Sequence, residues 1–301
     1  MNYLPFVLIS YFLNSIAVTV DKVLLTKTIP DPLIYVFYFS LLSFLAFFGL
    51  PFTHTPTTEV FIMASASTLL WTLGAYCMFK ALKIGLLQRV IPIIGVITPL
   101  TLLLLASSDN SITSSQALAI VILIFGLIFL TMQDWKGRFI TKVESFSLKN
   151  WFQALLIKKE LALDIFSGIL FAFSYYLLRL AYLQEDFLTV LVYSRFILIP
   201  LAFLFLIIPS LRNRILPMLH LGGVIKKAAP LFVFGQISAG ISELLLVFSI
   251  SLASPAIVNS LQGVKYIYLL GFSLIIDKKF PKLFQIIGIG FIGIGLYLLV
   301  S

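Results

Sequence analysis

The chain has 301 residues, of which 60% are hydrophobic and 11% are charged, and its mean hydropathy is +1.10. Soluble proteins are about 45–50% apolar and about 25% charged, so the composition predicts a polytopic membrane protein. The net charge of +9 does not indicate nucleic-acid binding, because the basic residues are spread over many loops. One Cys and two His exclude an internal disulfide and leave too few soft ligands for a structural zinc site.

The apolar runs are long enough to be membrane helices. A helix that crosses the hydrocarbon core needs about 20 mostly apolar residues. Apolarity without strict alternation favours helices over a barrel. The first run lacks a basic leader and a small-residue cleavage site, so we interpret it as a span. We expect ten spans, at approximately 3–21, 32–51, 59–81, 87–106, 114–132, 161–181, 187–208, 229–251, 255–276 and 283–300.

The longest polar interruption, residues 134–160, lies near the middle of the chain and mixes lysines with aromatic residues. This composition is typical of an amphipathic segment at the membrane surface. We therefore predict a basic cytoplasmic linker between two five-helix units, residues 1–133 and residues 161–301.

The basic residues also predict the orientation in the membrane. With ten spans, all 21 Lys and Arg residues except Arg179, Arg195 and Lys265 fall on one face. The positive-inside rule makes that face cytoplasmic, and both termini are then extracytoplasmic. The expected location is the plasma membrane.

An odd number of crossings in each unit makes the two units opposite in orientation, so that equivalent loops should differ in charge. The loop from Pro51 to Glu59 contains no Lys or Arg, whereas its counterpart after the seventh span contains four. The fifth span carries Gln116, Ala119 and Gly126. The tenth span repeats this spacing with Gln285, Gly288 and Gly295. Both patterns predict two inverted five-helix repeats in an all-α integral membrane protein.

In these residues the chain resembles the ten-helix, EamA-type transporters of the drug/metabolite transporter superfamily. The order that carries the resemblance is a Pro-containing fourth span from Gln88 to Pro99, an acidic turn at Asp109, then Gln116 and Gly126. The second unit keeps the acidic turn, Gln and glycines but has Gln262-Gly263 where a Pro is usual. The resemblance implies metabolite export or exchange through a central cavity lined mainly by helices 1, 3 and 4 of each unit.

Ionisable groups inside a bilayer cost about 2.5 to 3.5 kcal/mol each on insertion scales, so each is a functional candidate. Glu243 and Lys265 lie at similar depths on either side of a short turn and could pair. Asn259, Gln262 and Lys265 share one helix face, which fits a cavity wall. An ion pair that only joins helices is the alternative for this group, and proton carriage is an alternative for Glu243.

Five further residues complete the candidate binding or coupling set. Arg195 would hold a carboxylate or phosphate, or else extend to the interface or pair with a neighbouring helix. Asn14, Trp71, Tyr76 and Tyr175 fall on helices that the resemblance assigns to the cavity, although packing is an alternative role for each aromatic residue.

The sequence favours a secondary transporter of a small organic metabolite. The alternatives are an integral-membrane lipid-modifying enzyme and a non-transporting sensor or assembly protein. Gly288, Gly290 and Gly293 match a GxGxxG pattern but follow no strand, and we attribute them to close helix packing. There is no Walker A loop and no HExxH or GxSxG motif. We expect no enzyme activity, catalytic residue, cofactor, metal or nucleic acid, and the partners are a small-molecule substrate and the lipid bilayer. A coupling proton or ion and homo-oligomerisation are left open.

Overall fold

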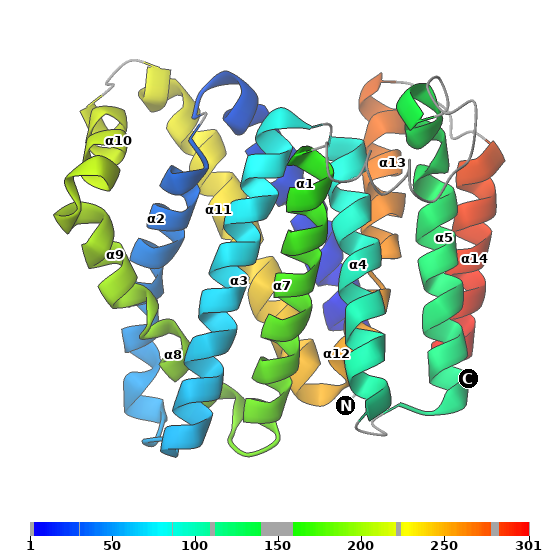
Figure 1. Ribbon diagram of the computed structural model, residues 1–301, viewed down its shortest axis with the longest axis horizontal. Helices are drawn as coiled ribbons and strands as arrows, with labels where there is room; N and C mark the ends of the chain where they lie inside the picture. The colour runs from blue at the N-terminus through cyan, green and yellow to red at the C-terminus, as the bar shows by residue number, and fades with distance from the viewer. Residues whose placement is uncertain are drawn as a thin grey trace.

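The computed structural model describes residues 3–29, 31–85, 87–108, 112–139, 159–220, 224–277 and 283–300. Within these ranges the regular structure is entirely helical (Figure 1). The elements in chain order are α1 (Leu4–Lys27), α2 (Pro32–Leu42), the 3-10 helix η1 (Ser43–Phe52), α3 (Thr58–Ile84), α4 (Leu87–Ser108), α5 (Ser114–Phe139), α7 (Lys159–Tyr182), α8 (Phe187–Arg195), α9 (Leu198–Ile207), α10 (Pro209–His220), α11 (Val224–Leu252), α12 (Pro255–Ser260), α13 (Gly263–Asp277) and α14 (Leu283–Val300). Most of the predicted linker and the acidic turn at Asp109 lie outside the described residues.

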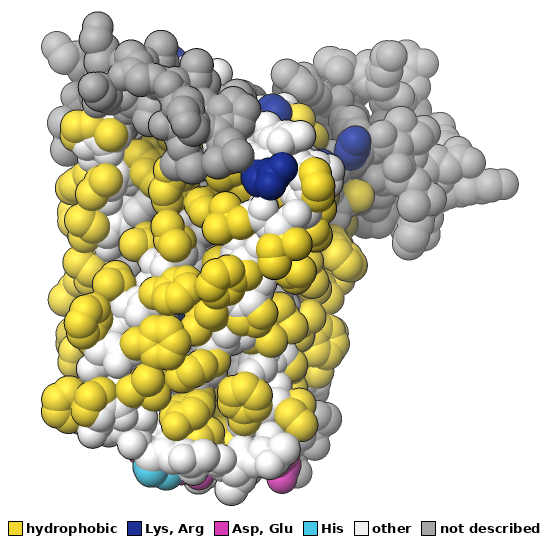
Figure 2. Space-filling view, turned by 90° about the vertical axis from the view of Figure 1, so that its left-hand side faces the viewer, with side chains coloured by type: hydrophobic (Ala, Val, Ile, Leu, Met, Phe, Trp, Pro, Cys, Tyr) yellow, Lys and Arg dark blue, Asp and Glu magenta, His cyan; other side chains and the backbone are white. Residues whose placement is uncertain are grey.

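The surface is that of a protein surrounded by lipid. Large apolar side chains are exposed along most of the long helices, Phe48 and Leu104 among them. Figure 2 shows this apolar surface on one side of the molecule, with Lys and Arg near one end and His and acidic side chains at the opposite end. The prediction of an all-helical membrane protein is therefore confirmed in its coarse form.

Six helices are long and apolar enough to cross a membrane: Leu4–Lys27, Pro32–Phe52, Thr58–Ile84, Lys159–Tyr182, Phe187–Ile207 and Ala229–Leu252. They coincide with six of the ten expected spans. Three shorter apolar helices, Val90–Ala106, Ser114–Leu130 and Leu283–Leu299, coincide with the fourth, fifth and tenth expected spans. The ninth expected span consists of two pieces, α12 and α13.

Three of the expected spans change their helical form partway along. In the second span, α2 continues as η1 at Ser43, where the Ser40 hydroxyl donates to the Val36 carbonyl and the Ser43 hydroxyl donates to the Ser40 carbonyl. Such hydroxyl bonds to the preceding turn tend to bend helices. The seventh span breaks after Arg195 and the ninth after Ser260. Helix breaks within a membrane are tolerated where they are buried in protein or line a cavity.

Two hydrogen bonds join the central helices in a reciprocal way. The Ser10 hydroxyl of α1 donates to the Ser242 carbonyl of α11 at 2.8 Å, and the Ser167 hydroxyl of α7 donates to the Gly74 carbonyl of α3 at 2.8 Å. Ser167 follows Ser10 by 157 positions and Ser242 follows Gly74 by 168 positions. The contact between α1 and α11 therefore has a counterpart between α7 and α3.

A second pair of contacts follows the same correspondence. The Lys22 ammonium of α1 donates to the Leu82 and Gly85 carbonyls at the end of α3, at 2.5 and 2.6 Å. The Arg179 guanidinium of α7 donates to the Ile250 and Ser251 carbonyls at the end of α11, at 3.0 and 2.8 Å. Arg179 follows Lys22 by 157 positions and Ile250 follows Leu82 by 168 positions. Each cation satisfies carbonyls that have no partner within their own helix.

Helices α5 and α14 pack backbone against backbone through glycines. A Cβ atom added to Gly126 would lie 2.9 Å from Ile292 and 3.0 Å from the Gly288 carbonyl oxygen. A Cβ atom added to Gly295 would meet Leu123 at 2.6 Å and the Ala119 carbonyl oxygen at 3.2 Å. A single offset of 169 positions relates the two sides of this contact: Gly295 corresponds to Gly126, Ile292 to Leu123 and Gly288 to Ala119. The contact is therefore also reciprocal.

The predicted packing role of the GxGxxG glycines is confirmed only for Gly288. A Cβ atom there would lie 2.7 Å from the Gly126 carbonyl oxygen, whereas Gly290 and Gly293 have open space around the Cβ position. The prediction was wrong for these two glycines, because they lie on other faces of α14.

Two glycines of α14 provide a matched test of the α5–α14 contact, because a Cβ atom has no room at Gly288 and is unobstructed at Gly290. Gly288→Ala should destabilise the protein by about 1–3 kcal/mol because the new methyl group cannot be accommodated without backbone movement. Gly290→Ala should be neutral or stabilising by up to about 1 kcal/mol, because alanine favours helix and nothing obstructs it. The melting temperatures of the two purified variants measure this difference. Equal melting temperatures would contradict the close α5–α14 contact.

Candidate functional site

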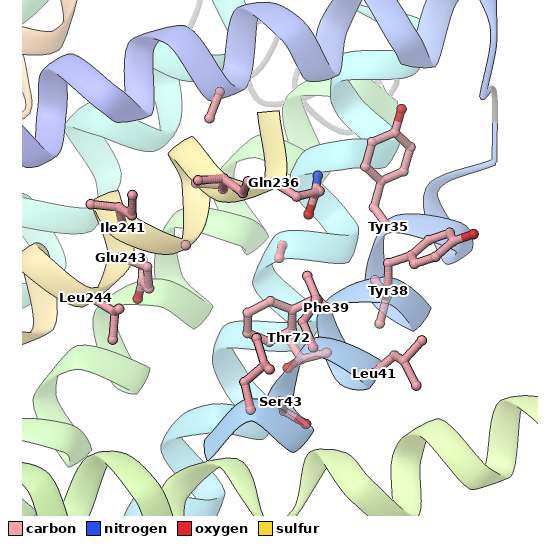
Figure 3. A pocket seen from close by; sticks show the side chains of 18 of the residues that line it. Tyr35, Tyr38, Phe39, Leu41, Ser43, Thr72, Gln236, Ile241, Glu243 and Leu244 are labelled. Carbon is pink, nitrogen blue, oxygen red and sulfur yellow. The ribbon is translucent and has the colours of Figure 1, made fainter. Parts of the chain in front are cut away.

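A cavity of about 910 Å³ lies inside the helix bundle, large enough for a drug-sized molecule. Its lining comes from α1, α2 with η1, α3, α8 and α11. Among the residues whose side chains the structure describes, none from the helices of the fourth and ninth expected spans lines the cavity. In this respect the structure differs from the expectation that the fourth helix of each unit lines the cavity. Figure 3 shows Gln236 and Glu243 of α11 facing Tyr35, Tyr38 and Phe39 of α2 across the cavity.

Most of the cavity wall is apolar or aromatic, and its charged groups are Asp21, Arg195 and Glu243. Arg195 is the last residue of α8, and its guanidinium carbon lies 5.6 Å from the centre of the Phe39 ring. Arg195 and Glu243 also line a second, smaller space of about 10 Å³, room for about one water molecule. The break after α8 therefore positions a cation close to the carboxyl of α11.

Trp71 links the cavity to this smaller space. Its ring stacks on Phe39 with 4.6 Å between the centroids, and its indole N–H donates to the Tyr175 hydroxyl at 3.3 Å. Trp71 lines both spaces, whereas Tyr175 lines only the smaller one. Of the predicted residues, Asn14, Trp71, Arg195 and Glu243 line the main cavity.

Lys265 and Glu243 have different partners. The Lys265 ammonium donates to the Asn14 side-chain oxygen at 2.7 Å, and the ammonium does not line the cavity. No ion pair joins Lys265 to Glu243 within the part of the chain that the structure describes. The structure thus replaces the expected Glu243–Lys265 pair with a bond from Lys265 to Asn14, which lies in the cavity wall.

Asn259 and Gln262 stabilise the break between α12 and α13. The Asn259 amide donates to the Pro255 carbonyl at 3.0 Å, and the Gln262 amide donates to the Asn259 side-chain oxygen at 3.1 Å. Neither residue lines the cavity. Tyr76 is also outside it, packed with the buried cluster around Phe37 and lying under the Lys80 ammonium at 5.4 Å.

Sequence reasoning missed Asp21. Its carboxylate is buried in the cavity wall and accepts a hydrogen bond from the Gln236 amide at 3.4 Å. The expected first span ended at Asp21, which made this residue a loop boundary. In the structure α1 continues to Lys27 and places Asp21 inside the helix. The apolar residues that follow Lys22 in the sequence could have indicated the longer helix.

A second polar cluster joins two loops at the end of the bundle opposite the basic residues. His54 precedes α3, and its Nε2 atom lies 2.6 Å from a carboxylate oxygen of Glu185. Its Nδ1 atom lies 3.5 Å from Asp186, which caps α8 by accepting hydrogen bonds from the Leu188 and Thr189 amides. The three side chains are close enough together to hold a metal ion, a site that the sequence did not predict.

The cap at Asp186 has a titratable contribution to stability. Burial alone would raise the pKa of this carboxyl, but hydrogen bonds from Thr189 and Leu188 and the nearby His54 lower it below its ordinary value. A group whose pKa is lower in the folded state stabilises the fold above its unfolded-state pKa, and this stabilisation is lost as the pH falls through the folded-state value.

Replacement of Asp186 tests this cap. Asp186→Ala should cost about 1 kcal/mol at neutral pH, because the α8 amides lose their acceptor. Asp186→Asn keeps an acceptor that does not titrate. The melting temperature of the wild type, measured relative to that of Asp186→Asn, should therefore fall as the pH is lowered below about 4. A constant difference between the two proteins from pH 7 to pH 3 would contradict the assigned role.

Comparisons with known proteins add information on the fold alone. No protein-family model matches the chain, and no curated protein matches it. A solved structure described only as "Crystal structure of protein" superposes with a TM-score of 0.55 at 12% sequence identity. The alignment covers 98% of this chain and 94% of that one. The arrangement of helices therefore extends over essentially the whole length of another protein of very different sequence.

Proposed function

We propose that this protein is a secondary transporter of a small organic molecule, built from two inverted five-helix repeats as in the EamA-type transporters that its sequence resembles. The observation that carries this proposal is the large cavity, with two carboxyls and a guanidinium in its wall, inside a bundle of membrane-type helices. Charged residues at membrane depth are costly, and they typically mark substrate or ion pathways.

The reciprocal contacts support the inverted repeat. Hydrogen bonds between α1 and α11 correspond to those between α7 and α3, and the α1–α3 contact of Lys22 corresponds to the α7–α11 contact of Arg179. The glycine contacts between α5 and α14 follow the same pattern: the contact of Gly126 with Ile292 corresponds to the contact of Gly295 with Leu123. Reciprocal contacts of this kind are expected when two copies of one module are related by a twofold axis.

The same correspondence suggests alternating access. Helix α3 packs closely on α8. Under the same correspondence α3 matches α11 and α8 matches α2, so the equivalent pair is α11 with α2. These two helices meet through the rings of Phe232, Tyr35 and Tyr38 but are not among the closely packed pairs of the described residues. One pair is therefore closed while the equivalent pair is separated. Exchange of the two arrangements would move the opening of the cavity to the other side.

Glu243 and Arg195 are the residues that we assign to the substrate or a coupling ion, because both line the cavity at the helix break. Lys265 acts as a positioning residue, since it holds Asn14 from outside the cavity. Proton coupling through Glu243 fits the same position.

The charge distribution supports a cytoplasmic basic end. Figure 1 shows the start of α1 and the end of α14 at the end of the bundle opposite the end of α5 and the start of α7. The positive-inside rule then makes the termini extracytoplasmic and the linker cytoplasmic.

Removal of the cavity carboxylate tests the proposed transport. Glu243→Gln in proteoliposomes should lower substrate counterflow at least tenfold while the protein still inserts, because the charge that binds the substrate or coupling ion is lost. Lys265→Met should cause a smaller loss, through Asn14. Glu59→Gln, at the exposed start of α3, is a matched control that should transport normally. Wild-type rates for Glu243→Gln would exclude this carboxyl from the mechanism.

A topology reporter fused after Ser301 tests the orientation. It should be active only on the extracytoplasmic side, since the basic loops are retained in the cytoplasm. A reporter in the central linker should give the opposite signal. A cytoplasmic C-terminal signal would reverse the proposed orientation.

A further inference from the structure

The cavity has an apolar opening on its side. Leu41 and Leu45 on one edge and Val233, Ile237 and Leu244 on the other line the cavity and are also exposed, Leu45 by 60% and Ile237 by 56%. The two edges are α2 with η1 on one side and α11 on the other, the helix pair that is not closely packed. Figure 3 shows Leu41 and Leu244 on opposite sides of the cavity.

The position of this opening favours contact with lipid. Both edges belong to helices with membrane-span character, Pro32–Phe52 and Ala229–Leu252. Other exposed residues on the same helices, such as Phe48 and Phe234, are apolar as well. Aromatic contacts from Phe232 to Tyr35 and Tyr38 narrow the gap between the helices at one end. The opening is therefore bordered by side chains suited to acyl chains.

The polar side chains occupy particular places in an otherwise apolar wall. Arg195 and Glu243 lie beside the small inner space, and Asp21 is paired with Gln236 farther along the wall. Together the charged groups are two carboxyls and one guanidinium, which leaves one negative charge when all are ionised. A molecule that matches this wall has an apolar body and a single positive charge.

We propose that the substrate is a membrane-dissolved amphiphilic amine that enters sideways from the bilayer between α2–η1 and α11. Its ammonium group contacts Glu243, and its alkyl or aromatic body lies along Phe39, Trp71 and the apolar rim. This proposal rests on the proposed transport function for its direction of movement, but the binding site and its lateral entrance can be tested without flux.

The first test uses the fluorescence of Trp71. The chain has three tryptophans, so Trp135→Phe and Trp151→Phe leave Trp71 as the single reporter in the cavity wall. Vesicles of phosphatidylcholine brominated near the middle of its acyl chains should quench this fluorescence, because quenching needs near contact with the bromine atoms. Ile62→Trp in a protein lacking the other tryptophans provides a reference on the outer surface of α3, because Ile62 is 60% exposed. Absence of Trp71 quenching would overturn the lateral entrance.

The second test identifies the ligand class on the same vesicles. Dodecylammonium should displace lipid from the cavity and restore Trp71 fluorescence, whereas butylammonium should require at least tenfold higher concentration. Each added methylene group raises the partition coefficient of the amine between membrane and water about fourfold, until all of the amine is membrane-bound. Laurate, which has the opposite charge, should restore much less fluorescence. Equal effects of laurate and dodecylammonium would overturn the preference for a cation.

A variant separates binding at Glu243 from general membrane effects. Glu243→Gln should keep the quenching by brominated lipid but lose at least tenfold in the affinity for dodecylammonium. Unchanged affinity would overturn the assigned head-group contact. Counterflow of labelled dodecylammonium then tests transport separately. Binding without flux would contradict the transport function but support the amphiphile site. Flux of a water-soluble metabolite, with no lipid access to Trp71, would support the transport function but contradict the amphiphile site.

Discussion

Hydrocarbon offers no hydrogen-bonding partners, and this constraint accounts for the way the helices of this protein are joined. The charged groups of Lys22 and Arg179 bond to carbonyls at the ends of neighbouring helices, where the backbone has no partner of its own. Asn259 instead donates to the Pro255 carbonyl of its own helix, just before the break that precedes α13. Side chains that look functional because they are polar within apolar runs thus divide into those that satisfy backbone groups and those that face the cavity.

The site depends on this division. Breaks after Arg195 and around Gln262 interrupt two spans, yet only the first contributes a residue to the cavity. At the second break the polar side chains bond to one another and to the backbone, and Lys265 turns to Asn14 on α1. Helix breaks therefore supply both a cavity cation and a means of holding the wall that surrounds it.

The all-helical, membrane-type character of the fold could be predicted from the sequence, because long apolar runs report directly on membrane helices. The close packing predicted for Gly288 is also present in the structure. The site was less predictable. Sequence places residues along a helix axis, but it does not determine the rotation of the helix, so the depth match of Glu243 and Lys265 did not produce a pair. Asp21 was missed because the charged residues Asp21 and Lys22 were interpreted as the end of the first span, although apolar residues follow them.

The glycine contact between α5 and α14 limits how these helices can move. Their backbones already touch near Gly126 and Gly288, so the helices cannot approach further, and the side chains of Leu123, Leu130 and Ile292 fill the space over the glycines. Relative motion of the two helices is consequently confined to a small shear or rotation about their seam. Helices α2 and α11 meet only through the rings of Phe232, Tyr35 and Tyr38 and form no such backbone seam among the described residues.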